Sequence, residues 1–129
     1  MPGLTDKAKR LLSEPNIVHL ATVMPDGSPQ VSPIWAHIED GLIEFNTAAG
    51  RVKEQNMRRD PRVAFSVVDR NDPYERASVR GRVVEMIDGD EARAHIDKMA
   101  KKYLGEDESP WYKGETRIIV RVEPEHCSD

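Results

Sequence analysis

Two Asp-Gly pairs, each lying between runs rich in β-branched residues, constrain the fold of this chain more than any other feature. Asp26-Gly27 joins the run 17–24 to the run 29–38, and Asp40-Gly41 joins that second run to 42–47. Asp-Gly between two extended runs is a strong local signal for a hairpin, so this part of the chain is predicted to form a three-stranded antiparallel meander. The middle run contains two prolines, which lack a backbone N–H. We therefore expect it to lie at a sheet edge or to contain a bulge.

Three further runs are typical of strands. The run 63–69 is apolar on both faces and is expected to be fully buried. The run 77–87 is long, and Gly81 at its middle indicates a bend or bulge where the sheet curls. The last strand is expected over 116–124, which brings the predicted total to about six antiparallel strands.

Helices are expected in three places. Thr5 is suited to cap a short helix near the N-terminus, and residues 48–59 are predicted to form a second helix. A third helix is expected to begin after Asp88, with Glu91 completing a capping box, and to end at Gly105. A sheet of this kind must cover its apolar face or close on itself. The predicted fold is mainly β, a small barrel with flanking helices.

Length and composition exclude several classes of protein. A chain of 129 residues with a net charge of −4 is expected to form one domain, residues 1–129, that binds no nucleic acid through overall positive charge. It contains no apolar run long enough to cross a membrane and no signal-peptide pattern, so a cytoplasmic location is expected. Cys127 is the single cysteine, and the four histidines lack metal-ligand spacing, so no metal site is predicted.

The segment between Arg51 and Arg62 reverses the overall charge, because it holds five basic and two acidic residues. The segment begins where a strand is expected to give way to a helix, whose first N–H groups favour anions. Thr47 is placed to add a hydroxyl donor, Arg51 and Lys53 to add charge, and Gly50 to leave room for a ligand. These residues predict a phosphate site. The alternative is an ordinary helix with a solvated basic face.

Three aromatic residues are further candidates for a site. Trp111 and Tyr112 lie in a polar loop before the last strand, where aromatic side chains more often line a site or an interface than a core. Trp35 alternates with apolar residues in its run, and the pattern is equally compatible with a core or dimer-interface residue and with packing against a ligand ring.

The charged segment and its surroundings resemble the cofactor loop of the pyridoxamine-phosphate-oxidase-like superfamily, the split-barrel flavin proteins. The residues that carry this resemblance are Phe45-x-Thr47, Arg51-x-Lys53, Asn56 and the RRDPR segment, 58–62. Three longer segments add to it. Residues 20–45 are similar to the first hairpins of that family, 78–86 to its long central strand and 110–124 to its closing strand.

The resemblance implies an FMN-binding type of split β-barrel and a homodimer with two cofactors at the subunit interface. By this analogy, Thr47, Arg51 and Lys53 hold the cofactor phosphate, and the 111–117 segment reaches the site from the other subunit. The full candidate cofactor-binding set is Ser32, Pro33, Ile34, Trp35, Thr47, Gly50, Arg51, Lys53, Asn56, Trp111 and Tyr112.

Two departures from the family pattern narrow the expected function. The second strand has no arginine and the C-terminal segment has no Arg-x-His, so oxidation of vitamin B6 is not expected. The short chain with Gly-Arg-x-Lys at 50–53 instead resembles the branch that uses the deazaflavin coenzyme F-420. FMN stays the alternative, because the two cofactors share the ring system and the first phosphate.

The remaining cations of the segment favour the deazaflavin. Its tail adds several carboxylates, which Arg58, Arg59 and Arg62 would attract. The alternative is that these arginines pair with neighbouring acids such as Glu54 and Asp60.

The expected activity is hydride transfer between the bound ring and an unsaturated small-molecule acceptor. The cofactor carries this chemistry, so no catalytic side chain is assigned, and Tyr112 or solvent would supply a proton. The alternative is a protein that binds a flavin, a deazaflavin or haem without turnover.

Overall fold

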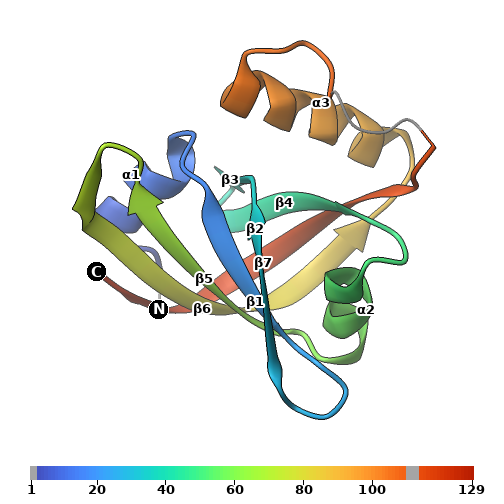
Figure 1. Cartoon of the computed structure of the whole chain (residues 1–129), viewed down its shortest axis with the longest axis horizontal. Coiled ribbons are helices and arrows are strands. Elements are labelled where there is room, and N and C mark those ends of the chain that lie inside the picture. Colours follow the sequence, from blue (N-terminus) through green and yellow to red (C-terminus); the bar gives the residue numbers. More distant parts are fainter. Residues whose placement is uncertain (1–2, 110–113) are drawn as a thin grey trace.

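Antiparallel strands make up one curled sheet in the computed structural model, which describes residues 3–109 and 114–129 (Figure 1). The strands are β1 (Val18–Val23), β2 (Pro29–Ile34), β3 (Ala36–Glu39), β4 (Leu42–Ala48), β5 (Arg62–Asp69), β6 (Asp72–Ile87) and β7 (Arg117–Ser128). The helices are α1 (Asp6–Ser13), α2 (Val52–Arg59) and α3 (Asp90–Leu104). The strand order is β2-β1-β5-β6-β7-β4-β3, so the mainly β fold with flanking helices is confirmed.

The run 29–38 is not one strand. It divides at Trp35 into β2 and β3, which lie at opposite edges of the sheet. The β1–β2 and β3–β4 hairpins form as predicted, but the prediction of a continuous meander is wrong. The chain passes from one edge to the other at Trp35 and so nearly closes the sheet into a split barrel. This division also explains why the described part of the chain has seven strands rather than six. Both prolines lie in β2, an edge strand, as expected for residues without an N–H.

Local backbone chemistry explains two of the predicted features. Asp40 and Gly41 have φ angles of 52° and 78°, the pair of positive values that a type I′ hairpin turn needs. At Gly81 the register between β6 and β7 shifts, and a Cβ there would collide with the carbonyl oxygen of Glu123. The predicted irregularity at Gly81 is therefore confirmed, and only glycine fits the close approach of the two strands.

The core lies on the concave face of the sheet. Val63, Phe65 and Val67 of β5 point into it, whereas Ser66 is exposed and Val68 is 41% exposed. The expectation that this strand is buried on both faces is wrong, because alternate residues of β5 face the core and those between them lie on a face left partly exposed.

α1 packs against β3, β5 and β6. The predicted cap is confirmed: the Thr5 hydroxyl accepts a hydrogen bond from the N–H of Ala8 at 3.1 Å. Ala8, Leu11 and Leu12 are fully buried and extend the core. No helix in the described ranges is both long and apolar enough to span a membrane.

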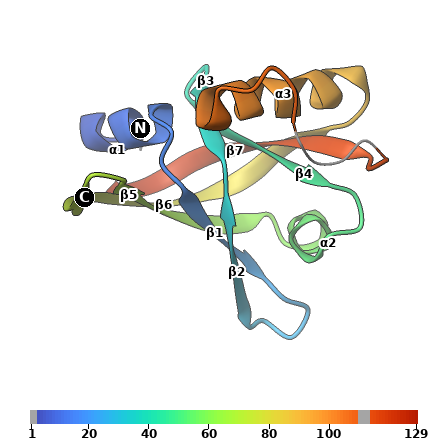
Figure 2. The same cartoon turned by 45° about the horizontal axis from the view of Figure 1, so that its top comes forward.

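α3 contacts β4 and β7 and lies across that side of the sheet (Figure 2). Gly89 precedes the helix and no side chain caps it, so the predicted capping box of Asp88 and Glu91 is wrong. Gly105 ends the helix in the left-handed conformation, with φ of 75°, as predicted. The second helix is shorter than expected. β4 extends to Ala48, and α2 therefore begins at Val52.

Candidate functional site

A cavity of about 450 Å³ lies at the β2–β3 crossover, where β4, the start of α2 and α3 converge. Its lining residues are Ile17, Pro33, Ile34, Trp35, Asn46, Thr47, Arg51, Lys53, Ile96, Met99, Ser109 and Arg117. One part of this lining is apolar and the other is cationic. Such a cavity suits a ligand that has a flat apolar body and an anionic group.

Six of the predicted site residues lie together in this lining. Pro33, Ile34 and Trp35 come from the crossover, whereas Thr47, Arg51 and Lys53 come from the end of β4 and the start of α2. Ser32 is linked to the group, because the Lys53 Nζ donates a hydrogen bond to its hydroxyl at 3.0 Å.

Thr47 lines the cavity and carries a buried polar group without a partner among the described residues. The residue is only 1% exposed. Its hydroxyl has no hydrogen-bond partner in the ranges that the structure describes. Leaving a buried hydroxyl unpaired costs about 1–3 kcal/mol, so a bound polar group at this position would relieve a penalty that the fold carries.

Two of the three cavity cations, Lys53 and Arg117, are poorly solvated, whereas Arg51 is exposed. Burial lowers the pKa of Lys53, and the positive charges of Arg51 and Arg117 lower it further. The Arg117 side chain is only 9% exposed, and burial lowers its pKa as well. Glu115 accepts hydrogen bonds from Arg51 at 3.0 Å and from Arg117 at 2.8 Å, and Lys53 adds a third positive charge to the cavity. The site therefore favours an anion.

The apolar part of the lining is a firmly held wall. Trp35 stacks on Tyr103 of α3, with 5.2 Å between ring centroids and 13° between ring planes. The Tyr103 hydroxyl donates to the backbone carbonyl of Asn16 at 2.7 Å, which fixes the stack against the barrel. Ile96 and Met99 of α3 line the same cavity. A planar ring would pack well against such a surface.

Two of the predicted site residues, Gly50 and Asn56, do not line the cavity and make structural hydrogen bonds instead. Gly50 is outside the lining; its φ of 91° requires glycine, and its N–H donates to the Glu54 carboxylate at 2.8 Å. That N–H is therefore not available to a ligand. Asn56 is buried away from the cavity, where its amide donates to the Thr22 hydroxyl at 2.9 Å and ties α2 to β1. Trp111 and Tyr112 lie outside the described residues, so their predicted roles stay predictions.

The arginines expected to attract a carboxylate tail have partners within the chain. Arg58 pairs with Glu54, and Arg62 pairs with Asp60 at 2.7 Å. Arg59 donates to a β1 backbone carbonyl at 2.6 Å. The hydrogen bonds from Arg62 lower the pKa of Asp60 to about 2. None of the three arginines lines the cavity. The expected alternative, pairing with Glu54 and Asp60, is confirmed for Arg58 and Arg62 but not for Arg59.

Sequence reasoning missed part of the lining. The missed residues are Ile17, Asn46, Ile96, Met99, Ser109 and Arg117. Ile96 and Met99 belong to a helical stripe that is typical of core packing. Arg117 falls in the 111–117 segment expected to serve the other subunit, yet it lines the cavity of its own chain, because Arg117 pairs with Ala48 in the β4–β7 register.

The sequence model of the pyridoxamine 5'-phosphate oxidase family matches residues 4–128. Among solved structures, an F-420 reductase is 33% identical, with a TM-score of 0.83, and the match covers 93% of this chain and 94% of that one. A conserved hypothetical protein from Mycobacterium tuberculosis is 26% identical, with a TM-score of 0.73 and coverage of 92% and 79%. A candidate pyridoxamine 5'-phosphate oxidase from Lactobacillus delbrueckii is 22% identical, with a TM-score of 0.72 and coverage of 98% and 94%, and supports the fold alone.

Proposed function

Because the chain belongs to the pyridoxamine 5'-phosphate oxidase family, we propose that it is an oxidoreductase that uses the deazaflavin coenzyme F-420. In this proposal a hydride passes between the bound ring and an unsaturated small-molecule acceptor. The similarity to an F-420 reductase over nearly the whole of both chains favours this cofactor over FMN, which shares the ring system and the phosphate.

One observation carries the proposal. Thr47, whose buried hydroxyl is unpaired within the described residues, lines one cavity with Arg51, Lys53 and Arg117, beside an apolar wall that contains Trp35. The polar part fits a phosphate and the apolar part fits a flat ring. The paired arginines Arg58 and Arg62 add no support for the deazaflavin tail, so the choice of coenzyme rests on the similarity to the reductase.

When bound, the ring supplies the hydride chemistry itself. In our proposal the chain has three tasks. Thr47 and Lys53 hold the phosphate, Trp35 and its neighbours in the crossover orient the ring, and Ile96 and Met99 of α3 exclude water from it.

We also propose that the chain is a homodimer. Edge strand β2 exposes Val31 at 60%, and the convex face of the sheet exposes Val68 at 41% and Val84 at 49%. Such surface is suited to burial against a second copy. Sedimentation at micromolar concentration tests this. The dimer predicts a species of twice 14.6 kDa, and a single species of 14.6 kDa would contradict it.

The activity is tested with the purified protein and F-420 or FMN. Each cofactor is chemically reduced without air in the presence of the protein, and unsaturated acceptors are then added while the ring spectrum is recorded. Faster reoxidation of reduced F-420 with the protein than without it supports the proposal. Tight binding with no protein-dependent reoxidation by any acceptor would instead indicate a cofactor-binding protein.

A further inference from the structure

A chain of hydrogen-bonded side chains runs behind the cavity, from Arg117 to the underside of α3. The Arg117 Nε donates to the Asn46 Oδ1 at 2.8 Å. The Asn46 Nδ2 lies 3.0 Å from the His95 Nδ1 and donates to the carbonyl of Ala92 at 3.0 Å. On the other side of the imidazole, the His95 Nε2 is 3.3 Å from a carboxylate oxygen of Glu44.

The end of this network under α3 is buried, whereas Asn46 and Arg117 line the cavity. His95 is 8% exposed and Glu44 is 2% exposed. Glu44 is held in turn by Arg121, whose Nε donates to its second oxygen at 2.6 Å. Groups buried this deeply depend on one another for hydrogen bonds, so a change in one of them alters the next.

The direction of each hydrogen bond is fixed by the groups at the ends. An arginine Nε can only donate, so the Asn46 atom facing Arg117 is the oxygen. A backbone carbonyl can only accept, so the Asn46 atom facing Ala92 is the NH₂ group. That NH₂ group also faces the His95 Nδ1, which must therefore carry a lone pair. The proton of the neutral ring then lies on Nε2, facing Glu44.

The side-chain amide of Asn46 already has hydrogen-bond partners within the chain. Both of its N–H groups are used by His95 and Ala92, and its oxygen holds Arg117. Arg117 bonds Asn46 through Nε and Glu115 through Nη1, and it lines the cavity. The guanidinium is thus held by two side chains beside the cavity.

We propose that His95 is a positioning residue: as a neutral Nε2–H imidazole it orients Asn46, which in turn holds Arg117 toward the anion in the cavity. The proposal rests on the proposed function for the identity of that anion. Protonation of His95 would place an N–H against the Asn46 NH₂ group, so the support for Arg117 requires the neutral ring.

The charges that face His95 come from three elements. Glu44 on β4 favours the protonated ring, whereas Lys98 on α3 and Arg121 on β7 oppose it. Burial is the largest effect and lowers the pKa of His95. These influences agree with the neutral ring that the hydrogen-bond directions require.

Two substitutions of His95 distinguish the contact made by its Nδ1 from the contact made by its Nε2. In His95→Asn the shorter amide offers an oxygen near the former Nδ1 and preserves the contact with Asn46. In His95→Gln the longer amide reaches toward Glu44 and leaves Asn46 without its partner. FMN is the anionic probe, and riboflavin, which lacks the phosphate, is the control.

We expect His95→Gln to weaken FMN binding about tenfold, and His95→Asn to stay within about threefold of the parent protein. Riboflavin binding is expected to change little in either variant. Equal losses of FMN affinity in the two variants, or no loss in His95→Gln, would overturn the proposal.

A comparison at about pH 7.5 and about pH 5.5 adds a second readout. The FMN phosphate itself loses charge near pH 6, and this loss is common to the parent and His95→Asn. Because burial lowers the pKa of His95, the imidazole is expected to stay neutral at both pH values, so the parent and His95→Asn should lose FMN affinity equally. A larger loss in the parent would show that the ring is protonated in this range and would contradict the neutral imidazole.

A measurement without ligand distinguishes failure of this inference from failure of the proposed function. In ¹⁵N NMR spectra of the unliganded protein at neutral pH, His95 is expected as the neutral Nε2–H tautomer. The Arg117 Nε–H resonance is expected to move in His95→Gln and to stay in His95→Asn. A charged or Nδ1–H imidazole, or an Arg117 resonance that is unchanged in His95→Gln, would overturn the inference. Failure of the parent to bind FMN and F-420 would overturn only the proposed function.

Discussion

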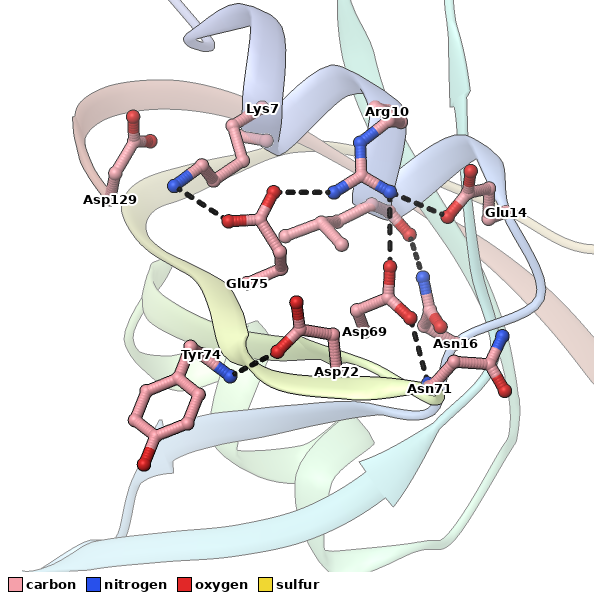
Figure 3. A network of polar contacts seen from close by, with 12 residues as sticks. Lys7, Arg10, Glu14, Asn16, Asp69, Asn71, Asp72, Tyr74, Glu75 and Asp129 are labelled. Atoms are coloured by element: carbon pink, nitrogen blue, oxygen red, sulfur yellow. Dashed lines mark hydrogen bonds and ion pairs between the residues drawn. The ribbon is translucent and has the colours of Figure 1, made fainter.

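Two groups of charged side chains, each beside a helix, differ in their balance of acidic and basic residues. The α1 cluster consists of Lys7, Arg10, Glu14, Asp69 and Glu75 (Figure 3). The cavity cluster consists of Arg51, Lys53, Arg117 and Glu115. The α1 cluster has three carboxylates for two cations, whereas the cavity cluster has one carboxylate for three cations.

The pKa of Arg10 in the α1 cluster shifts in the opposite direction to those of Lys53 and Arg117 in the cavity cluster. The hydrogen bond to Asp69 raises the pKa of Arg10, so the α1 cluster stabilises its charges. Burial lowers the pKa of Lys53 and of Arg117, so the cavity cluster holds charges that the fold disfavours. The first cluster joins α1 to the β5–β6 hairpin and is complete within the chain. The second is suited to an anion from outside, and this difference separates a structural cluster from a binding site.

Lys53→Met is expected to give the largest effect. Loss of a charge-assisted phosphate contact should weaken F-420 and FMN binding about ten- to a hundredfold, as measured by titration. The melting temperature should not fall, because the substitution removes a desolvated charge. Lys7→Met in the α1 cluster is the matched control and should leave both affinities unchanged. Unaltered affinity in Lys53→Met would remove this lysine from the site.

Thr47→Val and Thr22→Val compare two buried threonines. The Thr47 hydroxyl is unpaired, whereas that of Thr22 donates to Gln30 at 2.6 Å and accepts from Asn56 at 2.9 Å. Thr47→Val should weaken cofactor binding about five- to tenfold and raise the free energy of unfolding by about 1 kcal/mol. Thr22→Val should lower the free energy of unfolding by about 1–3 kcal/mol and leave binding unchanged. A loss of stability in Thr47→Val would show that its hydroxyl is already satisfied.

Arg10→Met tests the α1 cluster through its dependence on pH. Hydrogen bonds from the Asn71 backbone and from Arg10 lower the pKa of Asp69 below its usual value of 3.8. The carboxylate therefore adds stability above that value, and this stability is lost as the pH falls through the lowered pKa. In thermal unfolding, Arg10→Met should lower the melting temperature by a few degrees near neutrality, and less at about pH 3. A constant difference between the two pH values would contradict this account.

The smallest effect is expected from Arg58→Ala and Arg59→Ala. Their side chains bond Glu54 and a β1 carbonyl and lie outside the cavity lining. F-420 affinity should change by less than about threefold, and the change should shrink further at high salt. A larger loss, seen with F-420 and absent with FMN, would show that these arginines bind the coenzyme tail after all.

The features that local sequence determines were predictable. Asp-Gly turns located both hairpins, and the spacing of Thr47, Arg51 and Lys53 located the polar side of the cavity. The division of the run 29–38 was not predictable, because an unbroken extended pattern does not show that its two halves pair at opposite sheet edges. Arg117 reaches the cavity only through the register of β4 and β7, which is a long-range property.

Asn56 shows a further limit of sequence reasoning. Spacing places it on α2, but only the packing of that helix shows that its amide faces β1 rather than the cavity. Similarly, the stripe that contains Ile96 and Met99 indicates an apolar helix face. The cavity beneath that face appears only when α3 lies across the barrel.

Titration of the purified protein with F-420, FMN and riboflavin at physiological salt tests the central claim most directly. The cavity cluster predicts that FMN binds at least about tenfold more tightly than riboflavin, because only FMN brings a phosphate to Thr47 and Lys53. The proposed coenzyme predicts that F-420 binds more tightly than FMN. Equal affinity for FMN and riboflavin would contradict the phosphate site, and tighter binding of FMN than of F-420 would overturn the choice of coenzyme.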